Sequence, residues 1–427
     1  MDCLVSSQRI MSELFKTSTA LNVISSKLPM GVETIYRFLK LFFIMKKKVL
    51  VNIFILLILN SNLSADENNK TLKIGLVAPL TGTHSELGNS LLYSLQLALE
   101  EINDKNIIII PRDSGFNNKE KLNKAINEIK SNDVKVVIGP ITNDEFEIAE
   151  KHSDLIFISP SNINSKFFNN IISIGISLES QLLALLNFIK KQKKTKTVIM
   201  YPQNQYLKLI EKELKNLNLN NIKTFTYSPN PEILTGEIEK LTNYTQRKRS
   251  LELRKKMFED KEDEESIKEL ERLEQLYTLG NVNFDSVIII DFGNNLKSVL
   301  TSLVYTDVNQ NNVLFTTVNQ WFDESIFYEN TIKDLYYPSV NLKEFEKYNK
   351  KYFKKFNSYP SEITILTYDA LGLIYYTWKK NGKIKSVNDF SFKNKIKGKI
   401  GTFSFKNNKV IQELDIYKTE NKKFIKF

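Results

Sequence analysis

Hydroxyl and amide side chains follow several apolar runs of this 427-residue chain, at the points where those runs end. They are Thr81, Thr142, Ser159, Ser161 and Asn162. If the runs are parallel strands, their carboxyl ends share one edge of a sheet, where helix N-termini also offer N–H groups to a carboxylate. Each residue taken singly could serve only as a helix cap. Their joint occurrence at one edge favours a binding site for a small anion.

Residues typical of catalysis are sparse. The chain has two histidines, His84 and His152, in no metal-ligand spacing, and a single cysteine, Cys3. No nucleophile elbow, phosphate-binding loop or dinucleotide-binding glycine pattern is present. Asp113 and Asp291 both end predicted strands and could form an acid–base pair, although acids in this position more often cap the next helix. We therefore expect a protein that is not an enzyme, with no catalytic residues, no metal and no cofactor.

Strand–helix pairs position these side chains. The runs 72–81, 107–110 and 134–142 are largely apolar, and the first and third end near Pro and Gly, which is typical of parallel strands buried on both faces. Between them, 87–102 and 119–130 have apolar residues at three- and four-residue steps, so each predicts a helix with one apolar face. Strands and helices that alternate in this way predict a doubly wound α/β layer.

The alternation continues long enough to require a second layer. Further strands are predicted at 154–159, 171–176, 197–201, 222–227 and 284–291. We therefore predict an α/β fold of two doubly wound Rossmann-like lobes, the first made of residues 71–176 and 335–397 and the second of 177–334 and 398–427. The alternation over 399–417 predicts a β-hairpin near the end of the chain.

Residues 237–277 interrupt the second lobe. They show no strand pattern, and nine basic and ten acidic residues lie between Arg247 and Glu274. Apolar residues recur at helical spacing, which predicts two amphipathic helices that form a hairpin. Two interpretations stay open. The hairpin could pack its apolar residues on its own lobe, or it could bind a partner protein through four of them. These are Leu251, Phe258, Ile267 and Leu270.

The net charge of +11 does not indicate a nucleic-acid-binding protein. Residues 1–65 contain eight basic and three acidic residues, so a large part of the positive excess lies outside the predicted lobes. In the remainder, Lys and Arg are spread along the chain and form no cluster interleaved with aromatic residues. We therefore expect no nucleic-acid partner.

Residues 45–65 have the three parts of a secretory signal peptide. A Lys triplet, 46–48, precedes an apolar core at 49–59, and small residues follow up to Ala65. The core is shorter than the roughly 20 residues that span a bilayer, so we expect cleavage after Ala65, with an uncleaved membrane anchor as the alternative. Because a signal peptide begins a chain, we expect residues 1–44 to be a misassigned upstream extension.

With these elements and motifs, the chain resembles the type I periplasmic binding proteins of the leucine/isoleucine/valine-binding family. Four segments carry the resemblance: 74–82 (IGLVAPLTG), 98–103 (ALEEIN), 137–140 (VIGP) and 158–161 (ISPS). The resemblance covers essentially all of residues 71–427 and implies a two-lobed periplasmic protein that closes about its crossover strands. Transporter receptors, sensors and non-transport proteins share this fold, so the resemblance alone does not select one function.

Segments of the second half are similar to proteins identified as penicillin-binding protein activators in alphaproteobacteria. They are 241–247 (LTNYTQR), 277–280 (YTLG), 284–285 (FD), 305–307 (YTD), 321–323 (WFD) and 336–338 (YYP). This resemblance implies a non-catalytic regulator that stimulates a peptidoglycan synthase by protein contact, and we expect a monomer with this function. Activators of this type are often lipoproteins, whereas this chain has no Cys at its signal junction.

The family also implies an alternative function, the solute receptor of a branched-chain-type amino-acid ABC transporter, with the transporter permease as its protein partner. The resemblance would then place Thr142, Ser159 and Ser161 at the carboxylate of the amino-acid ligand. Tyr206 and Asp291 would face its ammonium group. In receptors of the family a Gly usually follows this Tyr, and this chain has Leu there. The regulator is therefore our first expectation.

Overall fold

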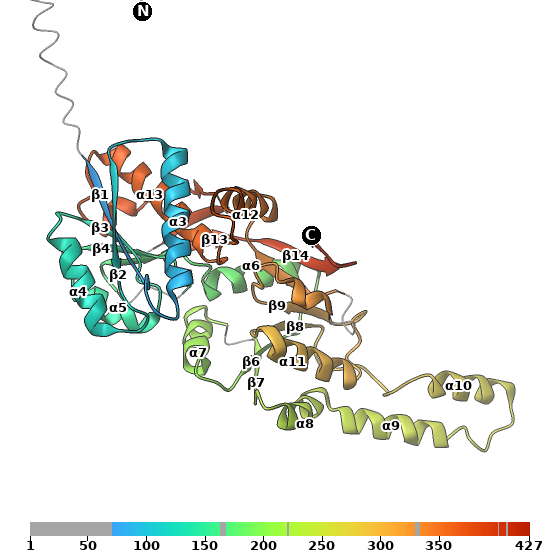
Figure 1. The fold of residues 1–427 in the computed structure, drawn as a ribbon. Coiled ribbons are helices and arrows are strands. Elements are labelled where there is room, and N and C mark those ends of the chain that lie inside the picture. Colours follow the sequence, from blue (N-terminus) through green and yellow to red (C-terminus); the bar gives the residue numbers. More distant parts are fainter. Residues whose placement is uncertain (1–70, 163–167, 220–221, 329–333, 400, 407–408) are drawn as a thin grey trace, which may run out of the picture. The chain divides into compact units, whose positions relative to one another are not determined.

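The computed structural model describes residues 71–162, 168–219, 222–328, 334–399, 401–406 and 409–427. The predicted upstream extension and signal peptide lie outside the described residues. The described part contains two β-sheets flanked by helices (Figure 1). None of its helices is both long and apolar enough to cross a membrane.

The first sheet has eight strands in the order β11-β12-β13-β5-β4-β3-β1-β2. Its doubly wound part and the helices of the first lobe are β1 (Leu72–Ala78), α3 (Ser85–Ile102), β2 (Ile107–Asp113), α4 (Lys119–Lys130), β3 (Val136–Ile138), α5 (Asn143–Glu150), β4 (Ile156–Ser159), β5 (Ile171–Ser173), α12 (Leu342–Phe356) and α13 (Thr364–Asn381). Ile74 and Leu76 of β1 are buried in one cluster with Leu95 of α3 and Ile374 of α13. Burial of these apolar faces holds the helices on the sheet.

The second sheet has seven strands in the order β15-β14-β10-β9-β8-β6-β7. The elements of this lobe are α6 (Leu178–Lys191), β6 (Thr197–Pro202), α7 (Leu207–Asn216), β7 (Lys223–Tyr227), α8 (Pro231–Thr242), β8 (Ser286–Ile289), α11 (Gly293–Tyr305), β9 (Leu314–Thr317), η4 (Glu324–Tyr328), β10 (Tyr336–Ser339), β14 (Asp415–Glu420) and β15 (Lys423–Lys426). Parallel pairing joins β7, β6, β8 and β9. Two doubly wound α/β layers, as predicted, are thus confirmed.

The lobe boundaries near the end of the chain differ from the prediction. β10 pairs with β9 and β14 in the second sheet, so the first lobe does not resume at residue 335 but at α12. β12 (Thr402–Lys406) and β13 (Lys409–Glu413) pair with each other beside β5, together with β11 (Ile396–Lys397), and so belong to the first sheet. The predicted boundary at residue 398 is therefore wrong. The chain changes sheets between Glu413 and Asp415.

Buried polar side chains join the segments that cross between the two sheets. The Gln412 side chain donates to the carbonyl of Ile174 at 2.6 Å. The Gln181 side chain accepts from the Asn319 N–H at 2.8 Å, and the Asn319 side chain accepts from the Ser339 hydroxyl at 2.8 Å. Because a buried polar group is costly when it has no partner, these bonds fix the paths of the crossing segments.

The predicted helical insertion is present as α9 (Tyr244–Lys256) and α10 (Glu264–Glu274), two antiparallel helices that follow α8 (Figure 1). The left-handed backbone of Asn243, with φ of 49°, ends α8 and redirects the chain into α9. The Asp263 side chain caps α10 by accepting from the Ser266 N–H at 2.9 Å. Figure 1 shows that the pair extends beyond α8 and α11, away from the strands. We call α9 and α10 the hairpin arm.

Glu101, near the end of α3, connects three other parts of the first lobe. Its carboxylate accepts hydrogen bonds from Tyr368 of α13, from Lys351 of α12 at 2.9 Å and from Lys399 after β11 at 2.9 Å. Burial raises the pKa of Glu101, but these three donors outweigh burial and lower the pKa to about 2. A carboxyl group with a lowered pKa stabilises the fold above its unfolded pKa and loses that effect as the pH falls toward the folded value.

We expect Glu101→Gln to lower the Tm at pH 7, because the neutral amide loses the charge-assisted bonds. The difference in Tm from wild type should shrink between about pH 5 and pH 2, where the carboxylate becomes protonated. Thermal unfolding followed by circular dichroism over this range measures it. Glu147→Gln, on the exposed face of α5, is the control. A difference that stays constant down to pH 2 would contradict the role assigned to Glu101.

Candidate functional site

The predicted hydroxyls of the first lobe lie along one edge of its sheet, as the strand order requires. Ser159 ends β4 and is fully buried. Its hydroxyl donates to the carbonyl of Pro140 at 2.5 Å and accepts from the Ser161 N–H at 3.1 Å. Thr142 precedes α5, and its hydroxyl donates to the Asn117 side chain at 2.9 Å. The hydroxyls of Ser159 and Thr142 thus bind the loops of the protein itself.

Thr81 belongs to a charged cluster at the same edge. Its hydroxyl donates to the Asp113 carboxylate at 2.5 Å, and Lys121 of α4 lies 2.5 Å from that carboxylate. Burial raises the pKa of Asp113, but the bonds from Lys121, Thr81 and the Gly115 N–H outweigh burial and hold the pKa well below its usual range. Asp113 is therefore one half of an ion pair, and it does not lie in the same lobe as Asp291.

Tyr206 and Asp291 follow β6 and β8, which are neighbouring strands of the second lobe. Tyr206 is 56% exposed, whereas Asp291 is buried. The Asp291 carboxylate accepts from the Tyr227 hydroxyl at 2.7 Å and from the Phe292 N–H at 2.8 Å. Burial raises the pKa of Asp291, which these hydrogen bonds oppose only in part, and burial also raises the pKa of Tyr227. Ligand binding by these residues stays a prediction.

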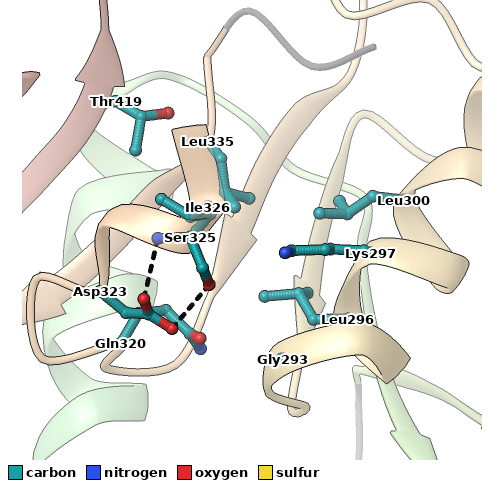
Figure 2. Close-up of a pocket in the computed structure, with 10 residues that line it drawn as sticks. All are labelled: Gly293, Leu296, Lys297, Leu300, Gln320, Asp323, Ser325, Ile326, Leu335 and Thr419. Atoms are coloured by element: carbon teal, nitrogen blue, oxygen red, sulfur yellow. Dashed lines mark hydrogen bonds between the residues drawn. The ribbon is translucent and has the colours of Figure 1, made fainter. Parts of the chain in front are cut away.

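A small cavity of the second lobe contains none of the five predicted ligand-binding residues. It lies between α11 and the loop around η4 and measures about 20 Å³, which is room for one water molecule (Figure 2). Figure 2 shows Asp323 accepting two hydrogen bonds from Ser325, on the side of the cavity opposite Leu296 and Lys297. An amino acid is too large for this cavity.

A larger groove of about 1080 Å³ lies among α3, α12, α13 and the strands β11 and β12. It also contains none of the five predicted residues. Three of its lysines pair with acids that line the same groove. The pairs are Lys395 with Glu413, Lys399 with Glu101, and Lys426 with Asp415. Because these charges neutralise one another, the groove has no strong preference for one sign of ligand.

One buried side chain, Arg247 of α9, holds the base of the hairpin arm and is 8% exposed. Its guanidinium donates to the carbonyls of Gly280 at 3.1 Å, Thr306 at 3.1 Å and Asp307 at 3.0 Å, and to the Thr278 hydroxyl at 2.6 Å. The Asp307 carboxylate lies 3.6 Å from Nη2. Burial lowers the pKa of Arg247, and the carboxylate opposes that effect. Three separate chain segments therefore meet at one cation.

These three segments are the ones at 241–247, 277–280 and 305–307 that the resemblance to activators singled out. Sequence analysis did not assign Arg247 any role. The available signal was its place four residues before Leu251, because a charged residue inside an otherwise apolar helical stripe predicts a buried ion pair or hydrogen-bond network. These three segments are far apart in the chain, but all of them contribute to the hydrogen-bond network of Arg247.

The four residues predicted to bind a partner differ in their exposure to solvent. Leu251 is 1% exposed and Leu273 of α10 is fully buried, so the inner faces of the hairpin arm pack within the protein. Phe258 and Leu270 are half-buried. Ile267 is 46% exposed. The structure therefore supports the packing interpretation for Leu251 and leaves Ile267 accessible.

We expect Arg247→Lys to loosen the base of the hairpin arm, because an ammonium cannot reach all the acceptors of the planar guanidinium. Unpaired buried acceptors should lower the stability of the arm by about 1–3 kcal/mol. Hydrogen–deuterium exchange should increase across residues 244–280, and Arg249→Lys on the exposed side of α9 should change little. Exchange that is equal in both variants would contradict the anchoring role of Arg247.

Residues 71–232 match the family model described as periplasmic binding protein. No curated protein matches the chain. Among solved structures, the C-domain of LpoA from Haemophilus influenzae, described as a regulator of PBP1A, is 12% identical with a TM-score of 0.56. That match covers 83% of this chain and 99% of the LpoA chain.

Two amino-acid-binding proteins are also similar. An ABC transporter substrate-binding protein from Desulfitobacterium hafniense in complex with Leu is 15% identical, with a TM-score of 0.55 and coverage of 84% of this chain and 100% of that chain. The leucine-binding protein LivK from Thermotoga maritima is 13% identical, with a TM-score of 0.52 and coverage of 84% and 98%. At these identities the similarity establishes the fold alone. The chain has the type I periplasmic-binding-protein fold, and its residues 71–232 match the periplasmic binding protein family.

Proposed function

We propose that this protein is a non-enzymatic periplasmic regulator of peptidoglycan synthesis that acts by protein contact, in the manner of penicillin-binding protein activators. The observation that carries the proposal is the hairpin arm, which Arg247 anchors and which exposes apolar side chains to solvent. The second sheet does not need the arm, because β6 already pairs with both β7 and β8 across the point where the arm leaves and returns. An exposed apolar feature that the sheet does not require is typical of a protein-binding site.

The strand ends support the same proposal. A receptor for amino acids needs polar groups that are available to the ligand. In this chain the Ser159 hydroxyl is bound to Pro140, and the Asp291 carboxylate is bound to Tyr227. A ligand would have to replace these bonds. The similarity in fold to LpoA, described as a regulator of PBP1A, fits a regulator.

A solute receptor of an amino-acid ABC transporter is the second candidate. It is favoured by the hydroxyls at one sheet edge and by the exposed ring of Tyr206. In this function Thr142, Ser159 and Ser161 would bind the carboxylate of the ligand. The Ser159 hydroxyl would then have to leave the Pro140 carbonyl, so ligand binding would carry a cost in the first lobe.

Both candidates act outside the cytoplasm. We propose that the protein is periplasmic. Residues 45–65 would act either as a cleaved signal peptide or as an uncleaved membrane anchor. For the regulator, the partner would be a peptidoglycan synthase of the same organism. For the receptor, it would be a transporter permease.

A thermal-shift screen of the purified protein against the common amino acids separates the two candidates. A ligand present at one hundred times its Kd stabilises a protein by about 2.7 kcal/mol, which is easily detected. For the regulator we expect no amino acid to raise the Tm. A reproducible rise with one amino acid, together with its loss in Thr142→Ala, would make the receptor the better proposal.

The regulatory activity itself is tested with a purified peptidoglycan synthase. We expect the protein to bind the synthase in surface plasmon resonance and to raise its rate of glycan-strand polymerisation. Heat-denatured protein is the control for nonspecific effects. An unchanged polymerisation rate at saturating protein, together with no measurable binding, would overturn the proposed function.

A further inference from the structure

We infer that the outer face of α9 is the part of the hairpin arm that binds the partner, and that the partner presents an acidic amphipathic segment. This inference rests on the proposed function and specifies the surface and the chemistry of its partner. We define the outer face as Arg249, Leu253 and Lys256 of α9 together with Met257, the C-cap residue of this helix.

Helix α9 is apolar on two opposite sides. Leu251 is 1% exposed and marks the side that packs within the protein. Since an α-helix turns by about 100° per residue, Leu253 and Met257 lie roughly 200° and 240° around the axis from Leu251. They are 55% and 62% exposed. The fold therefore covers one apolar side of α9 and leaves the other in solvent.

The basic side chains of α9 fall into two groups. Four are engaged inside the arm: Arg247 in the base network, Lys248 near the Tyr244 ring, Arg254 near the Phe258 ring and Lys255 beside Glu252. The other two, Arg249 and Lys256, have no ion pair or ring contact among the described residues. They lie about 160° and 140° around the axis from Leu251, so both are beside Leu253 and Met257, on one side of that apolar pair.

The acidic helix α10 does not neutralise these two cations. Its ion pairs in the described structure are internal, between Lys268 and Glu264 and between Arg272 and Glu269. Helix α9 itself has six basic residues and one acidic residue. The outer face thus combines two large exposed apolar side chains with two cations beside them.

A helical segment with apolar residues three or four positions apart and acidic residues beside them fits this surface. Its apolar side chains would cover Leu253 and Met257, which provides affinity. Its acidic side chains would face Arg249 and Lys256, which provides selectivity and a dependence on ionic strength. A partner with a basic surface would be repelled.

The test uses two ligands, so that this inference and the proposed function are judged separately. The first is a fluorescently labelled helical peptide of Glu and Leu at amphipathic spacing, with a scrambled peptide of the same composition and a peptide with Lys in place of Glu as controls. Fluorescence anisotropy with the purified protein measures binding at low and high salt. The second ligand is the purified peptidoglycan synthase, measured by surface plasmon resonance.

Three double variants are compared with wild type. We expect Arg249→Glu with Lys256→Glu to weaken binding of the acidic peptide about tenfold or more, which corresponds to roughly 1.4 kcal/mol, and to create binding of the basic peptide. Leu253→Ser with Met257→Ser should also weaken binding of the acidic peptide, without creating binding of the basic peptide. Lys190→Glu with Lys191→Glu at the exposed end of α6 makes the same change in net charge and should have no effect. All the altered side chains are exposed, so the Tm of each variant should match wild type.

The outcomes are distinct. If the two α9 variants lose binding to both the acidic peptide and the synthase, the inference and the proposed function are both supported. A synthase that binds wild type and both α9 variants equally overturns the inference and leaves the proposed function intact. Selective binding of the acidic peptide without any synthase binding overturns the proposed partner and leaves the surface assignment standing. If neither ligand binds wild type, both proposals fail.

Discussion

The hairpin arm depends on one buried cation. Its two helices have 13 and 11 residues, and isolated helices of that length are only marginally stable in water. Tertiary contacts must therefore hold the arm, and Arg247 supplies them by donating to Gly280, Thr278 and the turn at Thr306 and Asp307. A guanidinium in this position would be strongly destabilising if its donors were unpaired. The same bonds that compensate for its burial also fix the direction in which α9 leaves the lobe.

The two lobes form a scaffold whose strand ends are already occupied by internal bonds. Ser159 and Thr142 bind neighbouring loops, and Asp113 is neutralised by Lys121. In the second lobe, Asp291 is buried against Tyr227. On the arm, by contrast, Leu253 and Met257 face solvent. This arrangement is consistent with the proposed use of the fold to position a protein-binding element.

The doubly wound lobes could be predicted from the sequence, because a buried parallel strand is a continuous apolar run, whereas an amphipathic helix has apolar residues at three- and four-residue steps. The sequence also predicted the arm, since a charged stretch without strand pattern must be helical or irregular. It could not place the crossing at Glu413 and Asp415, because only Leu414 separates β13 from β14 and no Gly or Pro marks the crossing. Apolar spacing identifies a stripe without showing which side the fold covers, so the sequence left open whether Leu251 packs on its own lobe or contacts a partner. In the structure Leu251 is buried, whereas Leu253 and Met257 are exposed.

The measurement that tests this account most directly is hydrogen–deuterium exchange of the protein with and without a purified peptidoglycan synthase. The account predicts that the synthase slows exchange in the arm, over residues 244–274 and most strongly in α9. Exchange at the strand ends that carry Ser159 and Asp291 should be unchanged. Protection confined to those strand ends, or no protection anywhere under conditions where the synthase is bound, would contradict the claim that the arm is the functional surface.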